Sequence, residues 1–157
     1  MDDKKLTVKD IMVREVVSVS PDASLTEAAK LIADHHFDGV PVVDSEKKLV
    51  GILTEYDLIS QSSQVHLPTF QAILQNLQVI QGDRAQFEKE IKEISSLKVK
   101  DVMNTDPLTL SENATYEDAV TAFREHHRVN PIPVLDGEKR VVGVVSRFDI
   151  LKPLREL

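Results

Sequence analysis

Cysteine and tryptophan are absent from this chain, and aromatic residues make up only 4% of its 157 positions. Without cysteine the chain can form no disulfide framework, no thiolate nucleophile and no thiolate metal site. The hydrophobic content of 41% is sufficient for a core. Because aromatic side chains are so few, that core must be mainly aliphatic.

Long hydrophobic runs are lacking as well. The N-terminal residues Met-Asp-Asp-Lys-Lys do not resemble a signal peptide, and no segment reaches the length that spans a membrane. We therefore expect a cytoplasmic protein with no membrane partner. The formal net charge of −7 argues against general binding to nucleic acid or acidic lipid, because both are negatively charged. A local cationic pocket remains compatible with that charge.

What the sequence does contain is an internal duplication. Val8-Lys-Asp-Ile-Met12 returns 91 residues later as Val99-Lys-Asp-Val-Met103, and the segment 51–57 returns 92 residues later as 143–149. One inserted residue near Asn130 accounts for the change in offset. A duplication predicts two copies of one supersecondary unit, each too small to bury its apolar face alone, packed on each other.

Each copy has the residue pattern of a β-α-β-β-α unit that follows a short helical turn, so we assign the chain to the α/β (α+β) class. Capping boxes open the first long helix, at Ser24 with Glu27 and at Thr115 with Asp118. The predicted strands are 16–19, 40–43 and 49–53 in the first copy and 108–110, 132–135 and 141–145 in the second, and a final helix follows Thr54 and Ser146.

The segment between the copies is far longer than an ordinary connection and should have structure of its own. Apolar residues at helical spacing over 70–80 and 87–94 predict two amphipathic helices. Their apolar faces either cover the pair of copies or meet another subunit. The expected organisation is therefore repeat 1 over 1–60, a helical insert over 61–98 and repeat 2 over 99–157.

A motif that closes each copy contains a glycine, two apolar residues, a hydroxyl residue, two variable residues and an aspartate. The hydroxyl and the acid are Thr54 and Asp57 in the first copy, and Ser146 and Asp149 in the second. One interpretation is a further capping box. In the other, the hydroxyl and the first-turn amides face an anion, while the acid accepts hydrogen bonds from a diol such as ribose. The two are compatible, and the presence of the whole motif in both copies favours the ligand-binding role.

Together, the turn that ends in methionine, the strand Pro-Val-x-Asp and the glycine-led motif, all duplicated, resemble the cystathionine-β-synthase (CBS) domain over residues 8–59 and 99–151. Two such domains in tandem resemble a Bateman module. The resemblance implies two repeats packed with pseudo-two-fold symmetry. It also implies two clefts that bind AMP, ADP or ATP, and in some members S-adenosylmethionine or NAD. Such modules regulate an attached or partner protein and carry no catalysis.

The resemblance also implies roles for individual residues. Thr54 and Ser146 match phosphate-contacting hydroxyls, and Asp57 and Asp149 match ribose-binding acids. Further ligand-binding positions implied by the match are Asp38, Gly39 and Val40, then Val129, Asn130, Pro131 and Ile132, and around the first strands Val17, Ser18, Pro107 and Thr109. One cleft in such modules commonly takes its hydroxyl and acid from one repeat and its base-facing loop from the other.

The copies differ in charge beside the hydroxyl, where the first has Glu55 and the second has Arg147. A carboxylate repels a phosphate, whereas an arginine can donate a charge-assisted pair of hydrogen bonds. We therefore expect the cleft served by Ser146, Arg147 and Asp149 to be the tighter one, unless Glu55 points to solvent and has no effect. Arg128 either contacts a phosphate or is a solvated cation.

The paired histidines at 35–36 and 126–127 are not expected to hold a metal, because adjacent helical residues point about 100° apart and no acid or cysteine stands at ligand spacing. A helix C-terminus favours a positively charged side chain, and this alone explains histidines at these positions. No acid or base lies in a distinctive catalytic pattern, so we expect the chain not to be an enzyme.

The sequence therefore predicts a stand-alone regulatory module that binds an adenine nucleotide, forms a homodimer and controls a protein that the sequence does not identify. S-adenosylmethionine and NAD are less favoured ligands, and no catalytic cofactor is expected. The alternative is a ligand-free oligomerisation or scaffold module in which the predicted insert helices form the interface.

Overall fold

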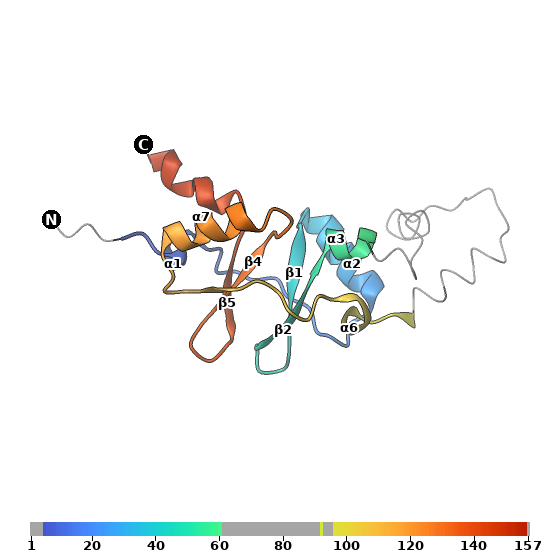
Figure 1. Ribbon diagram of the computed structural model, residues 1–157. Coiled ribbons are helices and arrows are strands. Elements are labelled where there is room, and N and C mark those ends of the chain that lie inside the picture. Colours follow the sequence, from blue (N-terminus) through green and yellow to red (C-terminus); the bar gives the residue numbers. More distant parts are fainter. Residues whose placement is uncertain (1–4, 61–91, 93–95, 157) are drawn as a thin grey trace, which may run out of the picture.

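The computed structural model describes residues 5–60, 92 and 96–156. The first copy contains α1 (Val8–Ile11), α2 (Leu25–His35), β1 (Gly39–Val43), β2 (Leu49–Thr54) and α3 (Glu55–Ser60). The second contains α6 (Val99–Val102), β3 (Leu110–Ser111), α7 (Tyr116–Glu125), β4 (Ile132–Leu135), β5 (Val141–Val145) and the 3-10 helix η1 (Asp149–Glu156) (Figure 1). This mixed arrangement of small sheets and helices confirms the predicted fold class. The predicted insert helices lie, apart from Lys92, outside the described residues.

The strands form two small sheets. β1 and β2 make an antiparallel pair, while β4 pairs antiparallel with β5 and parallel with β3. The two hairpins meet at their tips, where Leu49 N donates to Lys139 O at 3.2 Å and Val141 N donates to Lys47 O at 3.1 Å. These two bonds join repeat-related positions reciprocally. The copies are therefore related by a pseudo-two-fold axis between the hairpin tips, as the resemblance implied.

The first strand of each copy is shorter than the sequence pattern predicts. In the segment 16–19 only Val19 pairs, through a parallel bridge to Val42. The Val16 amide bonds locally to Arg14 O at 3.0 Å, so it cannot join a ladder. In the second copy pairing begins only at Leu110, which pairs with Val134 of β4.

The last helix of the second copy also differs from the α-helix that the pattern predicts. It is a 3-10 helix that begins at Asp149 and contains Pro153. Proline removes one backbone donor and clashes with the preceding turn, which prevents a regular α-helix there. None of the helices in the described ranges is long and apolar enough to cross a membrane.

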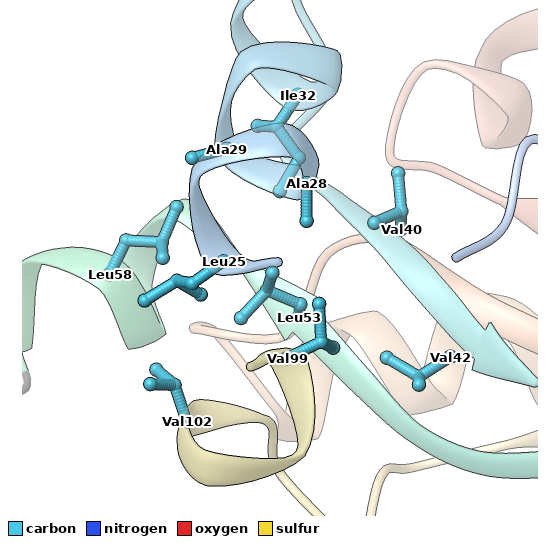
Figure 2. Packing of buried hydrophobic residues seen from close by; sticks show 10 residues of the cluster. All are labelled: Leu25, Ala28, Ala29, Ile32, Val40, Val42, Leu53, Leu58, Val99 and Val102. Carbon is cyan, nitrogen blue, oxygen red and sulfur yellow. The ribbon is translucent and has the colours of Figure 1, made fainter. Parts of the chain in front are cut away.

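The two cores exchange their opening turns. Val99 and Val102 of α6, which begin the second copy, pack with Leu25, Leu53 and other residues of the first (Figure 2). Reciprocally, α1 of the first copy packs with α7, β4 and β5 of the second. Figure 1 shows this crossing, with α1 beside the orange and red elements and α6 beside the blue and green ones. The sequence pattern does not predict this exchange, because a repeated residue pattern does not specify which copy a turn packs against.

Backbone pairing fixes each exchanged turn to the opposite sheet. Val13 and Val144 exchange two hydrogen bonds of 2.9 and 3.0 Å, and the repeat-related pair Asn104 and Ile52 exchanges two of 2.9 Å. Each exchanged turn is therefore held both by apolar packing and by a short antiparallel bridge.

The repeated glycine makes room for the repeated methionine. A Cβ atom on Gly143 would lie 2.5 Å from Sδ of Met12, and one on Gly51 would lie 2.8 Å from Sδ of Met103 and 2.7 Å from the backbone oxygen of Asn104. Only a residue without a side chain fits below the turn that arrives from the other copy. The methionine and the glycine that recur in both copies therefore contact each other, each methionine with the glycine of the opposite copy.

We expect Gly51→Ala to destabilise the fold by about 1–3 kcal/mol. The added methyl group meets the Asn104 carbonyl, which cannot move away without breaking its bridge to Ile52. Gly137→Ala is the matched control, because no atom lies within 4 Å of a Cβ placed there. Urea unfolding of both variants measures the difference. Equal stability of the two would contradict the packing role of Gly51.

Candidate ligand-binding clefts

Two hollows lie between the copies. The larger, called cleft A, has a volume of about 310 Å³ and is walled by first-copy residues between 13 and 41 and by Val144, Ser146, Phe148 and Asp149 of the second copy. The smaller, called cleft B, has a volume of about 210 Å³ and is walled by Thr54, Tyr56 and Asp57 of the first copy and by second-copy residues between 104 and 131.

The two clefts are related by the internal repeat. Ser146 and Asp149 stand in cleft A where Thr54 and Asp57 stand in cleft B, 92 residues apart in each case. Each cleft thus takes its hydroxyl and acid from one copy and its facing loop from the other, as in the family that the sequence resembles.

In cleft B the acid has one oxygen available. Asp57 Oδ2 accepts hydrogen bonds from Thr54 N at 2.9 Å and from Thr54 Oγ1 at 2.8 Å. Asp57 N donates back to Thr54 Oγ1 at 3.2 Å, so the capping box is complete. Its other oxygen, Oδ1, has no partner among the described residues, and Asp57 belongs to the wall of cleft B. The cap and a ligand can therefore share this carboxylate.

In cleft A the equivalent acid is fully engaged. Asp149 is only 6% exposed. Its Oδ2 accepts from Ser146 N and Oγ at 2.7 and 2.9 Å, and its Oδ1 lies 2.7 Å from Lys152 Nζ. Lys152 in turn donates to Ile11 O at 2.7 Å, on the exchanged turn α1. A ligand diol would have to displace Lys152 before it could reach this carboxylate.

Arg147 does not take the position that the sequence-based ranking of the clefts assumed. Its Nη2 donates to the carbonyl oxygens of His126, His127 and Val129, at 3.3 and 3.4 Å for the first and last, and its guanidinium lies 5.3 Å from the centre of the Phe123 ring. These contacts hold the guanidinium beside the residues that follow α7. Arg147 therefore lines neither cleft in this structure, whereas the sequence-based ranking took it to face a bound phosphate.

The arginine that lines a cleft is Arg128. It belongs to the wall of cleft B, where Nη1 donates to Tyr56 Oη at 3.1 Å and the guanidinium lies 5.7 Å from the centre of the Tyr56 ring. Arg128 comes from the second copy and Tyr56 from the first. The contact joins the copies at the mouth of cleft B and leaves other guanidinium donors for a ligand.

A polar wall separates the clefts. Asn130 Nδ2 donates to Asp38 Oδ2, and Asn130 Oδ1 accepts from Arg147 N at 3.1 Å. On the other side Glu55 N donates to Asp38 O at 3.0 Å. Partial burial raises the pKa of Glu55, and repulsion from Asp38 and Asp57 adds to that effect.

Most of the predicted site residues line a cleft. Cleft A is lined by Val17, Asp38, Gly39, Pro131, Ser146 and Asp149, and cleft B by Thr54, Asp57, Pro107, Arg128, Val129, Asn130 and Pro131. The other five do not line either cleft. Val40 and Ile132 are buried in the two cores, Ser18 lines a separate pocket of about 140 Å³, and Thr109 and Arg147 line none of these hollows.

The physical reason for the first three exceptions is strand alternation. Along an extended segment successive side chains point to opposite faces, so Val17 faces cleft A while Ser18 faces away, and Gly39 lines the cleft while Val40 enters the core. The same alternation separates Pro131 from Ile132.

Sequence reasoning missed several lining residues. They are Val13, Glu15, His36, Phe37, Pro41, Val144 and Phe148 in cleft A and Ile52, Tyr56, Asn104 and Leu108 in cleft B. Tyr56 and Phe148 occupy the second variable position of the repeated motif, so their shared aromatic character was a readable signal. Val13 and Asn104 reach the clefts only through the exchanged turns, which no local pattern reveals.

The histidine pairs show no common site. His35 Nδ1 lies 3.0 Å from Leu31 O and its ring stacks on Phe37, whereas His36 lines cleft A. Within residues 5–60, 92 and 96–156, no group of three or more His, Asp or Glu side chains could hold a metal ion.

The chain matches the family described as CBS domain over residues 8–63 and 99–156. Inosine-5′-monophosphate dehydrogenase of Methanocaldococcus jannaschii is 30% identical over 143 residues, which are 91% of this chain and 22% of that enzyme. The chain spans between 21% and 39% of the length of the first three curated relatives that it matches.

Solved structures show the same fold. The CBS domain of a CBS domain containing membrane protein from Sphaerobacter thermophilus has a TM-score of 0.73 at 28% identity and covers 95% of this chain and 88% of its own. CBSX2 of Arabidopsis thaliana, in complex with AMP, has a TM-score of 0.71 at 23% identity and covers 96% of this chain and 97% of its own. At that identity the second likeness shows the fold alone.

The raised pKa of Glu55 predicts a pH-dependent gain in stability for Glu55→Gln. The folded state holds the Glu55 proton more tightly than the unfolded state, so this group weakens the fold as pH rises from its ordinary pKa of 4.5 through the raised value. At pH 7 the variant should melt at a higher temperature than the wild type. Well below pH 4.5 the carboxyl is protonated in both states, and the advantage should vanish.

Thermal melting over a pH series measures this effect, and Glu125→Gln on the exposed face of α7 is the control. An equal rise in melting temperature for both variants at pH 7, or a rise that persists at acidic pH, would show that ionised Glu55 does not destabilise the fold.

Proposed function

The chain belongs to the CBS-domain family, with two copies of the domain in tandem, and on this basis we propose that it is a regulatory module that binds an adenine nucleotide. The nucleotide occupies cleft B. This assignment reverses the ranking expected from the sequence, because the arginine that decided that ranking points away from both clefts.

The observation that carries the proposal is the set of polar groups in cleft B. Arg128 supplies a cation, Asp57 supplies a carboxylate oxygen that no described residue bonds, and the Thr54 hydroxyl lies beside it just before α3. A phosphate needs charge-assisted donors and a ribose diol needs an acceptor, and these groups supply both. AMP is the ligand we test first, because the CBSX2 structure with this fold holds it.

A nucleotide in cleft B would contact both copies at once, since Arg128 and Asp57 come from different copies. Such a ligand favours whichever arrangement of the copies it fits better, and only by its difference in affinity between arrangements. The output is control of a partner protein or of further domains, without catalysis by these residues. The relatives that extend well beyond the matched segment are consistent with that role.

We also propose that the protein is a cytoplasmic homodimer. The exposed apolar residues Leu151 and Leu154 lie three apart along η1 and are 48% and 58% exposed, and Phe148, which is 74% exposed, lies in the turn just before that helix. Residues three apart lie on one face of a 3-10 helix, so they form an apolar stripe that a second subunit can cover.

That stripe also supports the second candidate function, an oligomerisation module whose clefts stay empty. Thermal shift with AMP, ADP, ATP, S-adenosylmethionine and NAD separates the two. A ligand at 100 times its dissociation constant adds about 2.7 kcal/mol of stability, whereas a module with empty clefts would show no shift with any of them.

We expect Arg128→Ala to weaken AMP binding about 10- to 100-fold, because a hydrogen bond to a charged group contributes about 1.5–3 kcal/mol. Arg124→Ala is the matched control, since Arg124 lies exposed on α7 outside both clefts. Adenosine, which has no phosphate, should bind both variants equally. Calorimetric titration measures all four affinities. Equal AMP affinity in the two variants would show that Arg128 does not contact the bound phosphate.

A further inference from the structure

A third hollow, called pocket C, lies outside both clefts. It has a volume of about 140 Å³ and is lined by Arg14, Val16, Ser18, Val43, Lys47 and Val141. The odd-numbered residues from 13 to 17 line cleft A, whereas the even-numbered residues from 14 to 18 line pocket C. Successive side chains of this segment thus face opposite sides. Pocket C shares no lining residue with either cleft, so it is a separate site.

The polar part of this wall is cationic. Its polar side chains are those of Arg14, Lys47 and Ser18, and no described Asp or Glu belongs to the wall. The formal net charge of the whole chain is −7, so two cations without a carboxylate in one small pocket run against the overall balance. This is a local cationic pocket of the kind that the net charge leaves possible.

The arginine of pocket C is anchored but still has donors to offer. Arg14 Nη2 donates to Lys9 O at 3.0 Å, and Arg14 O accepts from Val16 N at 3.0 Å, so both ends of the residue are positioned. Its Nε and Nη1 groups have no partner among the described residues. A guanidinium has five N–H donors in a planar fork, which matches the oxygen atoms of a phosphate.

The lysine lies at the tip of the hairpin between β1 and β2. Its φ of 65° is left-handed, and Asp44 Oδ1 stabilises the turn by accepting from two of its amides at 2.8 and 3.0 Å. Lys47 O accepts from Val141 N at 3.1 Å, so the backbone is fixed from both sides. Neither Lys47 Nζ nor the Ser18 hydroxyl has a partner in the described ranges. Both groups are therefore available to a ligand.

The internal repeat does not reproduce this pair of cations. The residue 92 positions after Lys47 is Lys139, which is also exposed and has a φ of 64°. The residue 91 positions after Arg14 is Thr105, which carries no charge. The turn lysine thus belongs to the repeated hairpin, whereas the arginine that joins it in pocket C belongs to the first copy alone.

We propose that pocket C binds a small phosphate-type oxyanion between Arg14 and Lys47, with the Ser18 hydroxyl as a third donor. Charge-assisted hydrogen bonds from both cations favour such a ligand. Arg14 follows α1, which packs on the second copy, and Lys47 belongs to the hairpin of the first. A bound anion would therefore link the two copies at a site away from the nucleotide clefts. This inference goes beyond the proposed function and does not depend on it.

Titration with inorganic phosphate tests the site. The reference is sodium chloride at matched ionic strength, because phosphate also stabilises proteins by general exclusion from their surfaces. The protein carries Arg128→Ala throughout, so that phosphate cannot bind to the arginine of cleft B. The dissociation constant, obtained from the phosphate dependence of the melting temperature, should rise about fivefold in Arg14→Gln and in Lys47→Gln, the upper range for one exposed charge pair. Lys139→Gln, at the repeat-related turn, is the matched control and should leave it unchanged.

Circular dichroism verifies that each variant is folded before titration. If Arg14→Gln does not fold, because its bond to Lys9 O is lost, Lys47→Gln decides alone, since the backbone contacts of that turn do not use the lysine side chain. Methyl phosphate, titrated in parallel, distinguishes a free ion from a phosphate monoester. Weaker binding than inorganic phosphate assigns the free ion and equal or tighter binding assigns the monoester group, and either result supports the site.

Three results would overturn the inference. The first is a phosphate effect no larger than that of sodium chloride, and the second is binding that is insensitive to Arg14→Gln and Lys47→Gln. The third is an equal loss in Lys139→Gln, which would show only general attraction to surface cations. In each case the proposed function stands, because AMP binding in cleft B is measured separately. AMP affinity should be the same in Lys47→Gln as in the wild type, because Lys47 lines neither cleft.

Discussion

Met12 of the first copy lies over Gly143 of the second, and Met103 of the second lies over Gly51 of the first. This reciprocal contact brings α1 into one core and α6 into the other, so neither core is complete without residues from the opposite copy. It also fixes the backbone after each turn to the opposite sheet, which brings Val13 to cleft A and Asn104 to cleft B. The clefts are therefore a property of the pair, and a single copy would contain neither.

Although the two copies are related by a pseudo-two-fold axis, the two clefts differ in charge. The capped turn is the same in both copies. In each, the backbone N–H and the hydroxyl of Thr54 or Ser146 donate to one carboxylate oxygen of Asp57 or Asp149. The side chains around the turns diverge. Lys152 occupies the second oxygen of Asp149, whereas that of Asp57 has no partner within the described part of the chain. The two repeat-related clefts therefore differ in their charged lining residues, with Arg128 and Asp57 in the wall of cleft B and Glu15, Asp38 and Asp149 in the wall of cleft A.

Much of this architecture could be read from the sequence. The duplication, the two hairpins, the helices capped at Ser24 and Thr115 and the hydroxyl–acid pairs are local patterns, and the structure has them where the patterns predict. Long-range choices could not be read. No local pattern shows that α1 packs on the other copy, or that Arg147 contacts the carbonyls of His126, His127 and Val129 rather than a cleft. Both depend on which groups tertiary packing brings close to α1 and to Arg147.

We propose that cleft B binds the phosphorylated nucleotide through residues of both copies. A crystal structure of the protein grown with AMP would locate the ligand without reference to any variant. We expect AMP in cleft B, with its phosphate against Arg128, its ribose hydroxyls on Asp57 Oδ1 and the Thr54–Asp57 cap intact. AMP in cleft A, with its phosphate beside Ser146 and Arg147 turned inward, would contradict it.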